Sequence, residues 1–323
     1  MHRLPSNYYQ AALLLTFENY NGKCLYLSFE NYEDELQLEL ERTPQVQIVW
    51  RKERLFLVEG DIKPLLWAQS HWLHPKNMTI ASIGEAQKIL RQAFSKWASY
   101  SIYAHRRCEL ISKNLNTVKS PIINFNIPYI EKDYGAWTLE NNNSLWYSAE
   151  VIPKLPLGIV QFQEDKVNPP SRAYLKLWEL FTIHGFAPKP GARVIDMGSC
   201  PGGWTWVLQK LGCQVISVDK APLHEKLNQL PNIEIFKKDA FSLKPEEIGP
   251  IDCFFSDIIC YPEKLLDLVQ KWRSSGLCNQ FICTIKFKGT TDYAILEKFA
   301  NIPNSKLIHL FVNKHEVTWI NGF

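Results

Sequence analysis

The sequence lacks the features that mark secreted, membrane and metal-binding proteins. No apolar run reaches the roughly eighteen residues of a membrane-spanning helix, and the first residues contain no apolar core of a signal peptide. The eight cysteines are scattered, with no Cys-x-x-Cys pair and no Cys/His spacing typical of zinc. We therefore expect a cytoplasmic protein in a reducing compartment, with no membrane span and no metal site.

A strong excess of one charge is also missing. The formal net charge is only +3, with Lys and Arg spread over both halves, so composition alone does not indicate a nucleic-acid partner. With 46% hydrophobic and 21% charged residues the composition is globular, and 323 residues favour two domains. The eleven tryptophans are expected mostly in the core. We expect a monomer.

The Gly-x-Gly-x-x-Gly fingerprint of NAD-binding domains is absent, but another glycine-rich turn is present. The apolar run Val194–Met197 leads into Gly198-Ser199-Cys200-Pro201-Gly202-Gly203, and a helix-like segment follows from Trp204. About twenty residues later a second apolar run ends in Asp219. Glycines let backbone N–H groups approach a ligand, and a carboxylate at that strand end suits ribose hydroxyls. The pattern predicts a nucleotide-type cofactor site, with an unrelated strand–helix turn as the alternative.

Strands and helices alternate from about residue 171, which predicts a mostly parallel sheet covered on both faces. The expected strands are 193–197, 214–218, 233–236, 253–256, 280–287, 306–311 and 317–320, and the expected helices are 171–186, 204–211, 262–274 and 292–300. Only about five residues join the last two strands, so these must be antiparallel. We expect an α/β fold with a Rossmann-like sheet and an antiparallel last strand over residues 156–323.

The first part of the chain, residues 1–155, is expected to form small mixed α/β lobes. A turn at Asn21-Gly22 separates two strand-like runs, 11–17 and 24–29, and predicts a hairpin. A second hairpin is expected from 46–50 and 55–58, and the segments 65–73 and 85–97 have helical patterns.

Four ionisable residues occupy positions where a parallel sheet would gather them. Lys176 lies on the helix before the glycine-rich turn, Asp257 ends the fourth strand, Lys286 lies near the end of the fifth, and Glu316 precedes the last. Each of these residues also has an ordinary structural interpretation. Lys176 could be a solvated helix residue, and Asp257 could cap the helix that follows. Lys286 could snorkel from a strand end, and Glu316 could be an exposed strand-edge residue. Ligands bind at the carboxyl ends of the strands in such sheets, so we expect the four to converge there.

These residues and their surroundings resemble the FtsJ-like ribose 2′-O-methyltransferases. The similar stretches are Pro170-Ser171-Arg172 with Leu175-Lys176-Leu177, then Cys200-Pro201-Gly202-Gly203-Trp204-Thr205, and finally His315-Glu316-Val317-Thr318. The resemblance runs from about residue 155 to the end. It is nearest to the bacterial members that methylate a cytidine of 23S rRNA, so it implies an S-adenosylmethionine (SAM) methyltransferase sheet and an RNA partner. In that family the weakly similar first half carries a ferredoxin-like lobe and a THUMP RNA-binding domain.

The resemblance also implies a role for each site residue. Lys176, Asp257, Lys286 and Glu316 would be the catalytic tetrad. The cofactor would be held by a second set, namely Gly198, Ser199, Pro201, Gly202, Trp204, Asp219, Asp239 and Asp257. Within this set Asp219 would hold the ribose hydroxyls of SAM and Asp239 the adenine amino group. Asp196 is either structural or reaches the methionine amino group through water.

The tetrad suits the chemistry, because a ribose hydroxyl becomes a good nucleophile only when its proton is removed. A lysine accepts a proton only in its neutral form, which a second ammonium and partial desolvation favour. Lys176 could supply the second charge and Lys286 could be the base, but the sequence does not decide between the two lysines. Asp257 would orient Lys286 and hold the hydroxyl near the methyl carbon, and Glu316 would position Lys176 or the ribose.

Two other functions are considered. An RNA base methyltransferase would use Asp/Asn-Pro-Pro-aromatic at the fourth strand, where this chain has Asp257-Ile258-Ile259-Cys260, or a cysteine nucleophile, for which Cys260 and Cys283 lack the usual context. A non-catalytic SAM- or RNA-binding ribosome-assembly factor would keep the fold without turnover.

Overall fold

The structure is a computed structural model, and it describes residues 17–125 and 127–323. Contacts divide these residues into two compact units. The first contains residues 17–123 and 129–161, and the second contains 124–125, 127–128 and 162–323. No helix in the described part of the chain is long and apolar enough to cross a membrane.

The first unit contains a five-stranded sheet in the order β10-β4-β1-β3-β2. Its elements, with one helix after the first strand, are β1 (Tyr20–Ser28), α2 (Glu33–Arg42), β2 (Val46–Lys52), β3 (Leu55–Ile62), β4 (Ala68–Leu73) and β10 (Glu150–Ile152). The first four strands have the chain order and sheet order of a ferredoxin-like β-α-β-β-α-β unit in which the second helix is replaced by residues 63–67. The predicted hairpin of β2 and β3 is confirmed.

Two predictions for this sheet are wrong. The expected helix over residues 65–73 is instead β4, whose six side chains are all buried, so no alternation distinguished a buried strand from a helix. The expected turn at Asn21-Gly22 lies inside β1, where these residues pair with Asp61 and Gly60 of β3. Pairing with a distant strand thus overrides the local turn signal. Of the first arm of that predicted hairpin, residues 11–17, all but the last residue lie outside the described residues.

A second sheet in this unit has four strands in the order β5-β9-β8-β6. Its strands and covering helices are β5 (Lys76–Thr79), α3 (Ile83–Ala93), β6 (Trp97–Ser99), α4 (His105–Ser112), β8 (Gly135–Asn141) and β9 (Ser144–Ser148). Ser82 caps α3, because its hydroxyl accepts a hydrogen bond from the Glu85 N–H. Three short elements complete the first part of the chain, β7 (Ile122–Ile123), η1 (Pro156–Gly158) and β11 (Gln161–Phe162).

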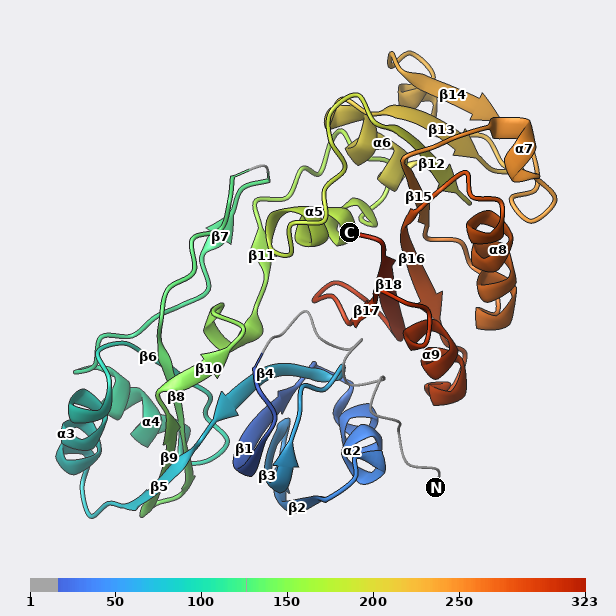
Figure 1. Ribbon diagram of the computed structural model, residues 1–323. Helices are drawn as coiled ribbons and strands as arrows, with labels where there is room; N and C mark the ends of the chain where they lie inside the picture. The colour runs from blue at the N-terminus through green and yellow to red at the C-terminus, as the bar shows by residue number, and fades with distance from the viewer. Residues whose placement is uncertain (1–16, 126) are drawn as a thin grey trace. The chain divides into compact units, whose positions relative to one another are not determined.

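The second unit is built on a seven-stranded sheet in the order β14-β13-β12-β15-β16-β18-β17 (Figure 1). Its strands are β12 (Arg193–Met197), β13 (Gln214–Val218), β14 (Ile233–Phe236), β15 (Cys253–Ser256), β16 (Gln280–Lys286), β17 (Ser305–Ile308) and β18 (Glu316–Asn321). The first five are parallel, and β18 lies antiparallel between β16 and β17. The predicted Rossmann-like sheet with an antiparallel last strand is confirmed.

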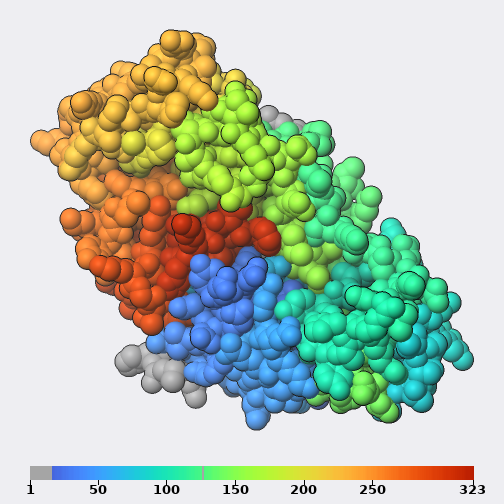
Figure 2. Space-filling view, turned by 180° about the vertical axis from the view of Figure 1, so that it is seen from behind, coloured from blue at the N-terminus to red at the C-terminus, as the bar shows by residue number. Residues whose placement is uncertain are grey.

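Helices cover both faces of this sheet. In Figure 1, α5 (Tyr174–Thr182) and α6 (Gly203–Lys210) lie on one face, and α8 (Pro262–Ser274) and α9 (Tyr293–Ala300) lie on the other. The short elements η2 (Glu225–Leu227) and α7 (Pro245–Ile248) occupy connections. Figure 2 shows the segment around α5, in green, beside the C-terminal segment, in red. The C-terminal segment of the second unit therefore lies beside α5, which is near the start of this unit.

Candidate active site

The four ionisable residues singled out from the sequence lie together in the second unit. Lys176 is on α5, Asp257 follows β15, Lys286 is the last residue of β16, and Glu316 is the first residue of β18. The antiparallel register makes Lys286 and Glu316 direct partners across the two strands. The sheet therefore fixes this pair, because side chains of paired residues lie on the same face.

The side chains form a compact network in which the two amines alternate with the two carboxylates. Lys176 Nζ lies 2.9 Å from Asp257 Oδ1, 3.2 Å from Asp257 Oδ2 and 2.6 Å from Glu316 Oε1. Lys286 Nζ lies 3.0 Å from Asp257 Oδ1 and donates to the Asp257 backbone oxygen at 2.8 Å. Its 3.9 Å distance to Glu316 Oε2 exceeds a hydrogen bond. Because these side chains are partly buried, the effective dielectric constant around them is low, and their ionic contacts are stronger than on an exposed surface.

The two lysines differ in their exposure. The Lys176 side chain is 8% exposed and the Lys286 side chain is 22% exposed. A cavity of about 290 Å³ reaches Asp257 and Lys286, while Lys176 and Glu316 are outside its lining. Lys286 is therefore the amine that a ligand in this cavity can reach.

The glycine-rich turn forms the other wall of the same cavity, through Gly198, Ser199, Cys200, Pro201, Gly203 and Trp204. Gly198 has φ +77°, and a Cβ there would lie 2.7 Å from the Ile258 side chain. Gly202 has φ +110°, and a Cβ there would overlap the Leu227 side chain. Both positions thus need glycine for the backbone conformation and for the close approach.

Asp219, at the end of β13, lines the cavity and braces the turn. Its carboxylate accepts hydrogen bonds from the N–H groups of Cys200 at 3.0 Å and Ala221 at 2.9 Å. Asp239 is outside the cavity lining, and its carboxylate pairs with Lys220 at 2.7 Å. The hydrogen bond from Lys220 lowers the pKa of Asp239. The cofactor-binding roles of Asp219 and Asp239 stay predictions.

Two buried polar groups face this cavity. Asp196 is 2% exposed, and burial raises the pKa of its carboxyl to about 7, although Thr205 donates a hydrogen bond to it at 2.7 Å. Ser199 is 6% exposed, and its hydroxyl has no hydrogen-bond partner in the described part of the protein. A buried hydroxyl without a partner is costly, so Ser199 is suited to a polar ligand group in the cavity.

Glu179 was not predicted from the sequence as a site residue, and it links α5 to the connection that leads to Glu316. It lies one turn after Lys176 on α5 and is 3% exposed. Both of its carboxylate oxygens accept from the backbone N–H of Phe311, at 3.0 and 3.1 Å, in the connection that leads to Glu316. The one available signal was a second charge three residues after Lys176 in an otherwise apolar helix.

Glu179 predicts a specific pH dependence of stability. Burial raises the pKa of its carboxyl from 4.5 to about 8, despite the hydrogen bonds from backbone N–H groups. Because the folded-state pKa is the higher one, this residue's stabilising contribution is complete below about pH 4.5 and is lost as the pH rises through 8. Wild-type protein should lose more free energy of unfolding between pH 5 and 8.5 than Glu179→Gln. Urea denaturation checks this, and parallel pH profiles for the two proteins would contradict it.

The strand order, the glycine-rich turn after β12 and the carboxylate ending β13 define a Rossmann-like methyltransferase fold. Comparison with known proteins indicates which methyltransferase family this unit is similar to. Residues 169–317 match the model of the FtsJ-like methyltransferase family. This match lies within the second unit, and it agrees with the family that the sequence motifs resemble.

Individual relatives agree with the family match. A protein from Shewanella sp. (strain MR-4), named ribosomal RNA large subunit methyltransferase M, is 29% identical over 225 residues, covering 62% of this chain and 59% of the relative. A protein of the same name from Cellvibrio japonicus (strain Ueda107) is 32% identical over 166 residues, covering 49% and 43%. The chain thus spans at most about 59% of these curated relatives. The crystal structure of TrmN from Thermus thermophilus aligns over 93% of this chain and 99% of its own, with 12% identity and a TM-score of 0.37.

Proposed function

We propose that this protein is a SAM-dependent methyltransferase that methylates a ribose 2′-hydroxyl of large-subunit ribosomal RNA. The observation that carries this proposal is the ionic network of Lys176, Asp257, Lys286 and Glu316, of which Asp257 and Lys286 line the cavity beside the glycine-rich turn. The family match and the names of the relatives support the reaction class and the RNA substrate. The cytidine specificity of the nearest family members is part of the proposal.

The cavity residues fit SAM as the cofactor. The glycine-rich turn lines the cavity through Gly198 and Ser199, and the Ser199 hydroxyl offers a hydrogen bond that the described part of the protein does not use. Asp196 and Asp219 provide carboxylates for the ligand's ammonium and ribose hydroxyls. When bound, SAM supplies a methyl group that its sulfonium has already activated. We propose that these residues hold it with Pro201 and Trp204.

Within the tetrad we propose Lys286 as the base that takes the proton of the 2′-hydroxyl. It has two close acceptors, the backbone oxygen and Oδ1 of Asp257. Two acceptors match the two N–H bonds of a neutral amine, which leaves the lone pair free to accept a proton. Lys286 also lines the cavity, where the ribose would lie next to the methyl group.

The other three residues would orient the base and the sugar. Lys176 contacts three carboxylate oxygens, so it is suited to remain an ammonium that holds Asp257 and Glu316 in place. Asp257 contacts both lysines and would fix the direction of the Lys286 amine. Holding the reacting groups in line would contribute a large part of the rate.

Methylation of a base through a cysteine nucleophile fits the structure less well. Cys283 is fully buried in β16, and burial raises the pKa of its thiol well above the usual value. Burial also raises the pKa of the Cys260 thiol, to about 11. Only a thiolate is an effective nucleophile, so neither thiol is suited to attack a base at neutral pH.

The proposed function is tested by mapping 2′-O-methyl groups in RNA from cells with and without this protein. We expect one ribose methylation in large-subunit rRNA to disappear without it and to return with the wild-type gene. Unchanged maps of rRNA and tRNA, together with SAM binding in calorimetry, would favour a non-catalytic assembly factor instead.

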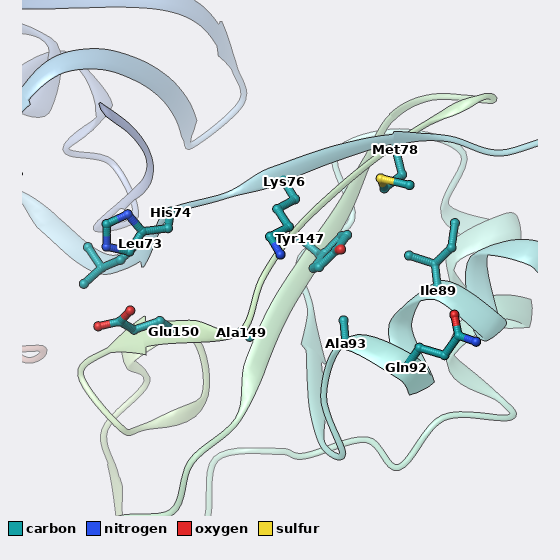
Figure 3. Close-up of a pocket in the computed structure, with 10 residues that line it drawn as sticks. All are labelled: Leu73, His74, Lys76, Met78, Ile89, Gln92, Ala93, Tyr147, Ala149 and Glu150. Atoms are coloured by element: carbon teal, nitrogen blue, oxygen red, sulfur yellow. The ribbon is translucent and has the colours of Figure 1, made fainter. Parts of the chain in front are cut away.

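We further propose that the first unit binds RNA. A cavity of about 430 Å³ in this unit is lined by residues of β5, α3 and β9, and it is shown in Figure 3. His74 and Glu150 lie at one end and Ile89 and Gln92 at the other, with Lys76 and Tyr147 between them. Lys76 is exposed, whereas the neighbouring Tyr147 is only 7% exposed, so the Lys76 amine suits a phosphate group of the RNA.

Lys76→Ala is expected to weaken RNA binding several-fold and to reduce the slope of log Kd against log salt concentration by about one, because one phosphate contact is lost. Binding of labelled rRNA fragments at several salt concentrations measures both. Lys88→Ala, an exposed lysine on α3 outside this cavity, is the matched control. Equal effects of the two substitutions would exclude a specific contact at Lys76.

A further inference from the structure

Two large apolar side chains lie exposed directly after the tetrad residue Asp257. Ile259 is 88% exposed and Tyr261 is 62% exposed. Single apolar residues on a surface are common, but these two lie within four residues of the proposed reaction centre. Ile259 also lines the cavity that reaches Lys286.

The local packing explains why these side chains point outward. The Ser256 hydroxyl donates to the backbone oxygen of Met197, which ties the end of β15 to β12. Asp257 is held by both lysines, and Ile258 packs against Gly198 of the glycine-rich turn. The inward positions are thus filled, and Ile259 is left at the mouth of the cavity.

Tyr261 is held on a rigid element. It is the N-cap residue of α8, and Pro262 follows at the first helical position, where proline is well suited. The backbone at Tyr261 is thus ordered before a partner binds, which reduces the entropy that binding costs.

The charge around this segment suits a nucleic acid. Cys260, between the two apolar residues, lies close enough to Lys286 and Lys264 that both charges lower the pKa of its thiol, against the larger raising effect of burial. A base carries an apolar face next to a phosphate, so neighbouring apolar and cationic side chains match a nucleotide.

We infer that Ile259 and Tyr261 receive the base of the nucleotide whose ribose is methylated, and that they position this nucleotide for the reaction. The inference rests on the proposed function, because the ribose must lie beside Lys286 for its base to reach these side chains. The contact is with the face of the base and not with its edge, so it positions the nucleotide without requiring one particular base.

A double-mutant cycle between protein and RNA tests this inference. The substrates are a short RNA containing the mapped target nucleotide and the same RNA with the target base removed but its ribose retained. We expect Tyr261→Ala and Ile259→Ala to reduce kcat/KM roughly 10- to 100-fold on the intact RNA. On the abasic RNA, wild type and variants should be nearly equal, since the contact is already lost. Tyr261→Phe should retain the wild-type value.

The matched control is Ile235→Ala, which removes a side chain that is 48% exposed on the distant edge strand β14. Its kcat/KM should not change, and the Kd for SAM should be unchanged in Tyr261→Ala, because Tyr261 is outside the cavity lining. Equal losses on intact and abasic RNA, or a weakened SAM affinity in Tyr261→Ala, would overturn the inference. If wild-type protein methylates no ribose at all, the proposed function itself fails, and that result is separate from the outcome of the cycle.

Discussion

Replacing Lys286 by alanine should abolish methyl transfer while leaving SAM binding intact. The proposed base would be lost, and removal of a positioned proton acceptor typically lowers the rate by about 10²- to 10⁴-fold. The glycine-rich turn and Asp219, which we propose to hold SAM, contact the cavity from other strands and should be unaffected. Single-turnover transfer to rRNA measures the rate, and calorimetry measures SAM binding.

Two variants serve as controls for Lys286→Ala. Lys288→Ala removes an exposed lysine two residues later and should keep full activity. Cys283→Ala removes the thiol of the same strand and should also retain transfer, because the proposed reaction has no cysteine nucleophile. A Lys286→Ala protein that still methylates RNA at the wild-type rate, or loss of transfer only in Cys283→Ala, would refute the role of Lys286.

Replacing Lys176 by methionine should destabilise the protein and also prevent transfer. Lys176 contacts both carboxylates of the tetrad, and its side chain is only 8% exposed. Removing Lys176 leaves Glu316 without its close cationic partner, and breaking a buried ion pair in this way typically costs about 3–5 kcal/mol. We expect a decrease of about 3 kcal/mol in the free energy of unfolding, measured by urea denaturation.

A second substitution tests whether Lys176→Met destabilises the protein through charge imbalance or through loss of packing. Glu316→Gln removes one of the two carboxylates, so the double variant Lys176→Met/Glu316→Gln should recover part of the lost stability. Lys298→Met, at an exposed position on α9, is the control for removal of a helical lysine and should be close to neutral. If the double variant is less stable than the sum of the single changes predicts, charge imbalance is not the cause.

The sheet of the second unit could be predicted because its strands and helices alternate along the chain. That pattern forces a parallel sheet, and the short connection before Glu316 forces an antiparallel last strand. These rules also bring the ends of β15 and β16 to one edge, so the meeting of Asp257 with Lys286 followed from the sequence.

Other features depend on contacts that no local pattern encodes. Glu179 accepts hydrogen bonds from Phe311, a residue 132 positions away, and only the folded chain shows this link. The strand β4 was predicted as a helix, because a strand buried on both faces has no alternation of apolar and polar residues. Packing also makes Lys176 more buried than Lys286. This difference in exposure is one reason why we propose Lys286, and not Lys176, as the base.

The central claim is that Lys286, positioned by the other three residues of the tetrad, removes a proton from a ribose hydroxyl beside bound SAM. The most direct measurement is nucleoside analysis of rRNA after incubation with the protein and SAM labelled in its methyl group. We predict that the label appears in a 2′-O-methylnucleoside with the wild-type protein and is absent with Lys286→Ala. Label in a methylated base, or SAM binding with no labelled RNA from any ribosomal substrate, would contradict the claim.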